Sequence, residues 1–214
     1  MNHWTPVIYI VDDDDSIRDV LGHFLQGEGL PTKAFASATD FLNSCDPGMR
    51  GCLLLDVRMP QLSGLEVQRI LAERKINIPI IFLTGYGDVP MSSQAFRNGA
   101  FDFLEKPFDN GELLERVRGA LSRDAEQWHE RARRAQLIDR FSQLTTREKE
   151  VLQLVSAGYS SKQVAKVLTI SNRTVDVYRA HIMQKMGADS LADLVAMALE
   201  LESDVVPIDH LMTA

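Results

Sequence analysis

Apolar residues in the first 122 positions form short continuous runs, and helical patterns separate these runs. The runs at 7–11, 52–55 and 79–83 contain almost no polar side chain, which predicts strands buried on both faces of a sheet. Shorter runs at 31–35 and 101–104 complete a set of five strands. Strands that alternate with helices predict a doubly wound five-stranded parallel sheet of the α/β class, because the crossovers are right-handed.

Apolar residues at helical spacing lie between these strands. The periodicity predicts helices at 15–26, 37–43, 64–74, 91–98 and 110–121. Asp14 and Asp15 stand at the start of the first helical pattern and fit a helix cap and its first turn. We therefore place a first domain at residues 1–122.

The remainder of the chain contains only helical patterns. Residues 123–142 have neither Gly nor Pro and predict a helical linker, which the preceding helix could continue. Residues 143–201 predict a four-helix domain, in which Thr145 and Glu148 form a capping box. Its short helix at 162–168, tight turn and longer helix at 171–186 match a helix-turn-helix. Residues 202–214 are expected to form a frayed tail.

Charge is distributed unevenly along the 214 residues. The net charge is −7, with −6 in residues 1–122 and +2 in residues 143–199. Nucleic acid is therefore a candidate partner for the second domain only. No apolar run approaches the ~20 residues that span a membrane, and the N-terminus lacks the features of a signal peptide. Free thiols at Cys45 and Cys52 indicate a reducing cytoplasm, and a redox switch is the alternative.

Polar side chains follow four of the predicted strands. Asp12 and Asp13 follow the first strand, Asp56 the third, Thr84 the fourth and Lys106 the fifth. Ligands of such sheets bind beyond the carboxyl ends of the strands. Each residue alone could be an ordinary loop or turn residue. Their joint occurrence, each after its own strand, predicts one functional site.

The chemistry of this predicted site points to phosphoryl transfer. Crowded carboxylates repel each other unless a cation lies among them, and Mg²⁺ (or Mn²⁺) binds one or two carboxylates together with water and phosphate oxygens. Asp56 could act as a nucleophile and form an aspartyl phosphate. Lys106 and the Thr84 hydroxyl would bind other phosphoryl oxygens. A carboxylate that is ionised at neutral pH needs no general base.

Residues 6–122 resemble the receiver domain of two-component response regulators in the segments IVDDD, LLLDVRMPQLSG, IIFLTGYGDVPM and GAFDFLEKPF. The resemblance implies the flavodoxin-like and CheY-like receiver fold. It implies that Asp56 accepts phosphate from the phosphohistidine of a sensor histidine kinase. It further implies that Asp13, Asp56 and the backbone carbonyl of Arg58 bind Mg²⁺ directly, while Asp12 acts through water.

The same resemblance implies a switch. Thr84 and Phe103 would form the switch pair, and the Lys106–Pro107 peptide would be cis. The family often has Tyr or His at the Phe103 position. Phe keeps the steric part of the switch and lacks the polar group.

The helix predicted at 171–186 carries candidate DNA contacts. Val175, Ile182 and Met186 are expected to face the core. Lys162 and Thr174 could bind phosphates near the start of this helix. The outward positions, which could reach base edges in the major groove, are Arg173, Asp176, Val177, Arg179 and Ala180. Asp176 is expected to accept from a cytosine amino group or to orient Arg179. Amphipathic helix pairs are also common as purely structural elements.

Residues 143–201 resemble the LuxR-type DNA-binding domain in the segments LTTREKEVLQLVSAG, SNRTVDVYRAHIMQKMGA and SLADLV. With the receiver, the whole chain resembles the NarL/FixJ family, and GDVPM and the helical linker favour its FixJ-like branch. Many relatives have Asn at position 161 and His at position 178, where this chain has Ser and Tyr. The resemblance implies double-stranded DNA and RNA polymerase as partners, and a homodimer that forms on phosphorylation.

Two other interpretations remain open at this stage. The receiver could serve only as a dimerisation module of a phosphorylation-independent DNA-binding regulator. A phosphatase with an Asp nucleophile is the second alternative, but haloacid-dehalogenase-type enzymes need a second Asp where this chain has Arg58. We therefore expect no turnover of an external substrate, only autodephosphorylation, and we expect a cytoplasmic protein without membrane contact.

Overall fold

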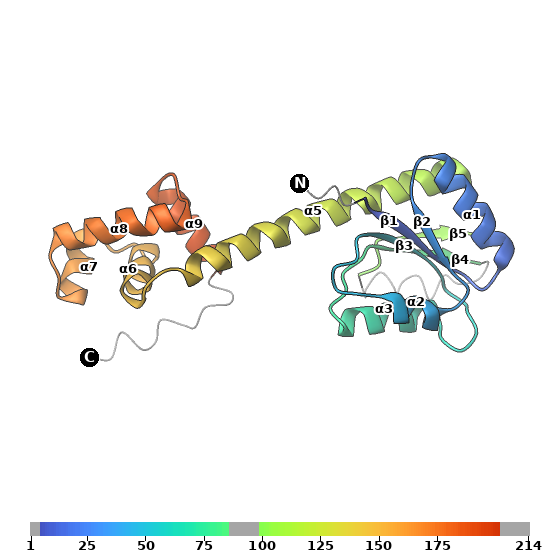
Figure 1. Ribbon diagram of the computed structural model, residues 1–214, viewed down its shortest axis with the longest axis horizontal. Coiled ribbons are helices and arrows are strands. Elements are labelled where there is room, and N and C mark those ends of the chain that lie inside the picture. The colour runs from blue at the N-terminus through green and yellow to red at the C-terminus, as the bar shows by residue number, and fades with distance from the viewer. Residues whose placement is uncertain (1–4, 86–98, 202–214) are drawn as a thin grey trace. The chain divides into compact units, whose positions relative to one another are not determined.

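The computed structural model describes residues 5–85 and 99–201 (Figure 1). The chain divides into two compact units, residues 1–128 and 129–214. The division falls within the segment 123–142 that the sequence predicts as a linker. The helix predicted at 91–98 and the tail at 202–214 lie outside the described residues.

The first unit contains a five-stranded parallel sheet with the order β2-β1-β3-β4-β5, which confirms the predicted fold class. Adjacent strands end at nearly the same level, since Val11 pairs with Leu55 and Thr84 pairs with Glu105. Residues that follow the strands therefore meet at one edge of the sheet. The strands are β1 (Val7–Val11), β2 (Thr32–Phe35), β3 (Gly51–Asp56), β4 (Ile80–Thr84) and β5 (Asp102–Glu105).

Helices cover both faces of the sheet (Figure 1). On one face, α2 (Ala38–Ser44) and α3 (Gly64–Glu73) pack in a core with Leu53 and Leu55. On the other face, α1 (Asp15–Gly27) and the first part of α5 (Asn110–Ser142) pack against Cys52 and Leu54. Successive strand residues point to opposite faces. This double burial explains why the strand sequences are continuously apolar.

Polar caps fix where two of these helices begin. The Asp14 carboxylate accepts a hydrogen bond from the Ser16 backbone N–H at 2.8 Å, so Asp14 is the predicted N-cap of α1. Ser63 and Glu66 form a capping box at the start of α3. The box ends the loop that follows Asp56 and starts the next helix directly.

Two glycines allow close backbone approaches around β3. A Cβ on Gly51 would lie 1.8 Å from the carbonyl oxygen of Val7, and its φ of +123° lies in the range that favours glycine. A Cβ on Gly64 would lie 2.4 Å from the carbonyl oxygen of Asp56. The strand that ends in Asp56 is therefore packed tightly against the chain at both ends.

The second unit is helical. It contains the end of α5 together with α6 (Thr146–Ser156), α7 (Ser161–Leu168), α8 (Asn172–Met186) and α9 (Leu191–Leu201). Thr145 and Glu148 form the predicted capping box before α6. The residues of α8 predicted to face the core are buried, namely Val175, Ile182 and Met186. The α7–turn–α8 segment has the predicted helix-turn-helix pattern.

Helix α5 contributes to both hydrophobic cores. Leu113 and Val117 belong to the core of the first unit, whereas Leu137 belongs to the core of the second. The predicted helical linker is thus part of one helix that runs from Asn110 to Ser142. Across the described ranges, no helix has the length and apolarity needed to cross a membrane.

Candidate functional sites

An acidic cavity opens at the carboxyl ends of β1 and β3. Its volume is about 350 Å³. Most of the polar residues that the sequence placed at the strand ends line it. The lining residues are Asp12, Asp13, Asp14, Ile17, Asp56, Arg58, Gly85 and Lys106.

Lys106 joins the two buried carboxylates of this cavity. Its Nζ donates to Asp12 Oδ2 at 2.7 Å and to Asp56 Oδ1 at 2.6 Å. The second oxygen of Asp56 accepts from the Arg58 backbone N–H at 2.8 Å. Charged hydrogen bonds of this kind are stronger than neutral ones. The ammonium therefore fixes two carboxylates that would otherwise repel each other.

Burial and charge act in opposite directions on these groups. Burial raises the pKa of Asp56, the hydrogen bond and the charge of Lys106 lower it, and the charge of Asp12 raises it again, with a net pKa above the ordinary 3.8. Burial lowers the pKa of Lys106, but its bonds to Asp12 and Asp56 raise that pKa above the ordinary 10.5. Lys106 is thus a stable cation at neutral pH.

The donors around the cavity suit a hard cation. Asp12 and Asp56 provide buried carboxylate oxygens, and the exposed Asp13 lies on the rim. Magnesium commonly uses one or two carboxylates and retains several waters. Among residues 5–85 and 99–201, no group of three His, Cys, Asp or Glu side chains is close enough to hold a metal ion. A cation here would therefore take its other ligands from backbone, water or phosphate oxygens.

Thr84 and Phe103, the expected switch pair, are not among the residues that line this cavity. The Thr84 hydroxyl points to the Leu104 carbonyl oxygen at 3.5 Å, and Thr84 is buried. Phe103 packs against the core on the α2–α3 face of the sheet. The Lys106–Pro107 peptide is cis, which confirms the expectation from the receiver resemblance.

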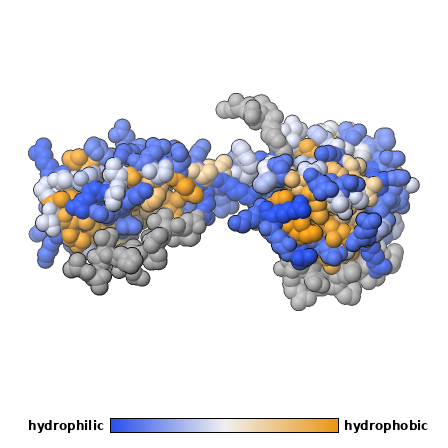
Figure 2. All heavy atoms as spheres, turned by 60° about the horizontal axis from the view of Figure 1, so that its bottom comes forward, coloured by the Kyte–Doolittle hydropathy of each residue, from blue (hydrophilic) through white to orange (hydrophobic). Residues whose placement is uncertain are grey.

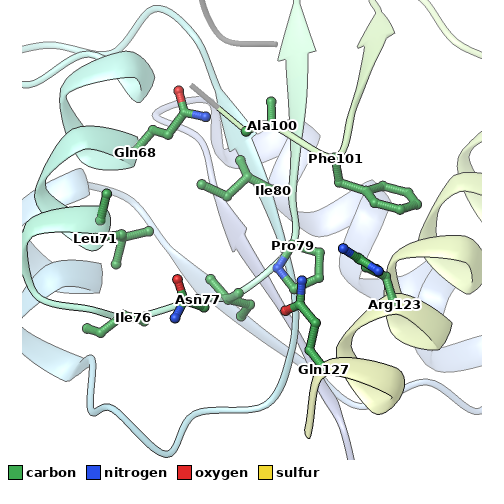
Figure 3. A pocket seen from close by; sticks show the side chains of 13 residues that line it. Gln68, Leu71, Ile76, Asn77, Pro79, Ile80, Ala100, Phe101, Arg123 and Gln127 are labelled. Carbon is green, nitrogen blue, oxygen red and sulfur yellow. The ribbon is translucent and has the colours of Figure 1, made fainter. Parts of the chain in front are cut away.

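A second cavity of about 340 Å³ lies in the same unit at the opposite end of the sheet. Pro79, Ile80 and Phe101 line it at the starts of β4 and β5, and Arg123 and Gln127 reach it from α5 (Figure 3). Its lining shares no residue with the acidic cavity. The two cavities are therefore separate, and the acidic cavity holds Asp12, Asp13, Asp56 and Lys106 of the predicted strand-end residues.

Helix α8 carries the predicted DNA contacts in the second unit. Arg173, Asp176, Val177 and Ala180 are exposed, and Arg179 is partly buried. On the face of this unit that Figure 2 shows, hydrophobic patches lie among hydrophilic residues. Val177 is one of its exposed large hydrophobic side chains, so α8 presents charged and apolar groups together.

The start of α8 is held by its own polar residues. Ser171 caps the helix, because its Oγ accepts from the Thr174 backbone N–H at 3.0 Å. The hydroxyls of Ser171 and Thr174 lie 2.8 Å apart. Lys162, on α7, is exposed. The helix N-terminus and a lysine of this kind are suited to contact phosphates.

The sequence did not predict one set of contacts of α8. The Ser161 hydroxyl donates to Asp176 Oδ1 at 3.1 Å and accepts from Arg179 Nη1 at 2.8 Å. Orienting Arg179 was one of the two roles expected for Asp176, and the described contact between these two residues runs through Ser161. No local pattern identifies such a contact, since Ser161 lies 15 and 18 residues away from these partners.

Two family models match the chain. The response regulator receiver domain matches residues 8–118, and the luxR family of bacterial regulatory proteins matches residues 142–198. The chain belongs to the NarL/FixJ family of response regulators. This response regulator is therefore a two-component transcription regulator with a receiver and a DNA-binding helix-turn-helix.

Similar proteins match this response regulator over most of their length. Nodulation protein W of Bradyrhizobium diazoefficiens is 45% identical, over 90% of this chain and 85% of that protein. The transcriptional regulatory protein FixJ of Azorhizobium caulinodans is 44% identical, over 90% of this chain and 91% of that protein. The name of the second relative describes a transcriptional regulatory protein.

Solved structures agree with this assignment. The response regulator StyR has a TM-score of 0.82 and 42% identity, and the match covers 92% of this response regulator and 100% of that chain. Full-length FixJ from B. japonicum has a TM-score of 0.57 and 37% identity, and the match covers 94% and 99% of the two chains. Both similarities extend over the receiver and the helical unit.

Proposed function

We propose that transfer of a phosphoryl group to Asp56 switches this response regulator, and that a sensor histidine kinase supplies the group. The observation that carries the proposal is the pair of hydrogen bonds that Lys106 donates to Asp12 and Asp56 at the carboxyl edge of the sheet. A buried nucleophile beside a fixed cation suits phosphoryl transfer, because the cation can compensate the charge of the transferred group.

The transfer itself needs few protein groups. An oxygen of Asp56 attacks phosphorus, and the bond from phosphorus to the imidazole nitrogen of the kinase breaks. Lys106 moves from Asp56 Oδ1 to a phosphoryl oxygen, and the Thr84 hydroxyl binds another. The same site would release phosphate by autodephosphorylation.

Bound Mg²⁺ (or Mn²⁺) would offset negative charge on the phosphoryl oxygens. Asp13, Asp56 and the Arg58 carbonyl would hold it, with Asp12 acting through water. The hard-oxygen character of the acidic cavity supports this assignment.

Phosphorylation would then change the surface of the receiver. In this proposal Thr84 moves toward the phosphoryl group and Phe103 fills the space that it leaves. The surface formed by residues 91–98 and 101–105 would become a two-fold dimer interface. Residues 91–98 lie outside the described residues, so the support comes from Thr84 and Phe103.

Dimerisation would bring two helix-turn-helix units to two DNA half-sites. Linking two readers raises the apparent affinity without any new base contact. Arg173, Asp176, Val177, Arg179 and Ala180 would meet base edges, and Lys162 and Thr174 would meet phosphates. Action on transcription implies RNA polymerase as a further partner and the cytoplasm as the compartment.

The test is molecular mass in solution, with and without beryllofluoride and Mg²⁺, for the wild type and Asp56→Asn. We expect a shift from monomer to dimer in the wild type only. A dimer in every sample would support the alternative in which the receiver is a phosphorylation-independent dimerisation module. A monomer in every sample would contradict phosphorylation-gated dimerisation.

A further inference from the structure

We propose that Ser161 is a positioning residue for DNA recognition, and that its hydroxyl holds Asp176 and Arg179 as one reading unit. This inference rests on the proposed DNA contacts of α8 and adds a specificity determinant outside that helix. Ser161 is the first residue of α7, whereas both partners lie on α8.

The hydrogen bonds give the hydroxyl a defined role. A serine hydroxyl has one donor and two acceptor positions. Its hydrogen is directed to Asp176 Oδ1, and one acceptor position receives Arg179 Nη1. A single hydroxyl therefore connects an anion and a cation that stand three residues apart on one helix face.

This arrangement leaves recognition groups available on both side chains. A direct Arg–carboxylate pair is often bidentate and then occupies both oxygens of the acid. The contact through Ser161 uses one oxygen of Asp176 and one N–H of Arg179, whereas an arginine has five N–H donors. Asp176 is exposed and Arg179 is partly buried, so their remaining polar atoms can meet a ligand.

The chemistry of the pair indicates which bases it would bind. Arginine donates to guanine O6 and N7 in the major groove, and a carboxylate accepts from the cytosine amino group. A carboxylate that is fixed near the DNA is unfavourable against phosphates and favourable against this amino group. The pair would therefore select guanine and cytosine at neighbouring positions of a half-site.

Helix α7 does not depend on Ser161 for its cap. Ser160 and Gln163 form the capping box, in which the Gln163 side chain accepts from the Ser160 backbone N–H at 2.9 Å and from its hydroxyl at 2.7 Å. Loss of the Ser161 hydroxyl should therefore leave the helix-turn-helix folded. A variant without this hydroxyl can therefore distinguish a positioning role of Ser161 from a structural one.

The test uses the full chain with beryllofluoride and Mg²⁺ and selects binders from a randomised pool of double-stranded DNA. The variants are Ser161→Ala, Ser161→Thr, which retains the hydroxyl, and the control Lys162→Ala. We expect Ser161→Ala to reduce discrimination at one or two G/C positions by about tenfold at an unchanged melting temperature and salt dependence. Ser161→Thr should retain most of the preference.

Lys162→Ala should instead weaken binding to all sequences. It should also reduce the slope of log affinity against log salt concentration by about one. The inference is overturned if Ser161→Ala selects the wild-type sequences with undiminished preference, or if it weakens binding to all sequences equally. If the wild type itself enriches no sequence, the proposed DNA recognition fails together with this inference.

Discussion

The ring of Phe103 stacks on the ring of Phe82, with centroids 5.4 Å apart and an interplanar angle of 19°. The two residues are register partners on β4 and β5. The stack joins the edge strand β5 to β4 and includes one residue of the proposed switch pair. Phe103 thus has a role in packing the sheet that is independent of any role in signalling.

Replacing this ring should weaken the first unit. We expect Phe103→Leu to lower its free energy of unfolding by about 1 kcal/mol, since an aromatic pair contributes ~0.5–1.5 kcal/mol beyond its buried area. Phe103→Tyr keeps the ring and should stay close to the wild type. Urea unfolding followed by circular dichroism measures both. Equal stability of Phe103→Leu and the wild type would contradict the structural role.

Thr84→Ala should separate phosphorylation from dimerisation. The hydroxyl is 3.5 Å from the Leu104 carbonyl, at the long limit of a hydrogen bond, so its loss should cost little stability. We expect phosphorylation of Asp56 to persist. The free energy of dimerisation should become less favourable by ~1–3 kcal/mol, which is the usual size of an allosteric coupling energy. Phosphate incorporation and sedimentation of the same sample provide the measurement. Thr84→Ser should behave as the wild type, and undiminished dimerisation of Thr84→Ala would refute this switch route.

The second unit should lose stability in acid through Glu148. Its Oε2 accepts from Lys185 Nζ at 2.7 Å and from the Thr145 backbone N–H at 2.8 Å. Burial raises the pKa of Glu148, but its hydrogen bonds and the charge of Lys185 together lower this pKa by more. The net pKa therefore lies below the ordinary 4.5. The carboxylate therefore stabilises the fold above about pH 4.5, and this contribution is lost as the pH falls through the folded-state pKa.

Glu148→Gln tests this dependence. We expect the variant to lose on the order of 1–2 kcal/mol of unfolding free energy at neutral pH. The stabilities of the variant and the wild type should converge as the pH falls below 4.5. Thermal unfolding between pH 3 and 7 follows both proteins, and Glu130→Gln on the exposed side of α5 controls for the loss of one charge. A constant difference across this range would argue against a titrating contribution.

Cys45 should react slowly as a nucleophile. Burial raises its pKa to about 11, which the positive charge of Arg74 offsets only in part. Its Sγ also donates to the Phe41 carbonyl at 3.3 Å. Because the thiolate is the reactive form, alkylation by iodoacetamide should rise about tenfold per pH unit from pH 7 to 10.

Mass spectrometry of the folded protein measures this rate. Cys45→Ser should abolish the slow modification, because Cys52 is inaccessible to solvent in the fold. A rate that levels off near pH 8.5 would indicate an ordinary thiol and revive the redox switch as an alternative. Both cysteines are free thiols in the structure.

The sequence predicted most of the fold because local patterns and sheet geometry agree. Continuous apolar runs marked the buried strands, and parallel strands bring their carboxyl ends to one edge. Asp12, Asp56 and Lys106 could therefore be assigned to one site from the sequence. Some strand bounds differ from the prediction by one residue. Strand β3 begins at Gly51 and not at Cys52, and the backbone of Val7 lies too close to Gly51 for any side chain there.

Side-chain contacts across long separations could not be predicted in this way. Arg50 Nε donates to Asp124 Oδ2 at 2.8 Å, across 74 residues. Lys185 meets Glu148 across 37 residues. Such contacts depend on helix packing and rotamers, which a single sequence does not specify. The role of Ser161 escaped prediction for the same reason, although Asp176 and Arg179 were both identified.

The close approach of Gly64 to Asp56 restricts how this protein can be engineered. A Cβ at position 64 would meet the Asp56 carbonyl oxygen at 2.4 Å and also the side chains of Phe82 and Leu55. Any substitution there would push the backbone that carries the aspartate. A library for altered kinase pairing should therefore hold position 64 fixed and diversify exposed neighbours such as Arg58 and Pro60.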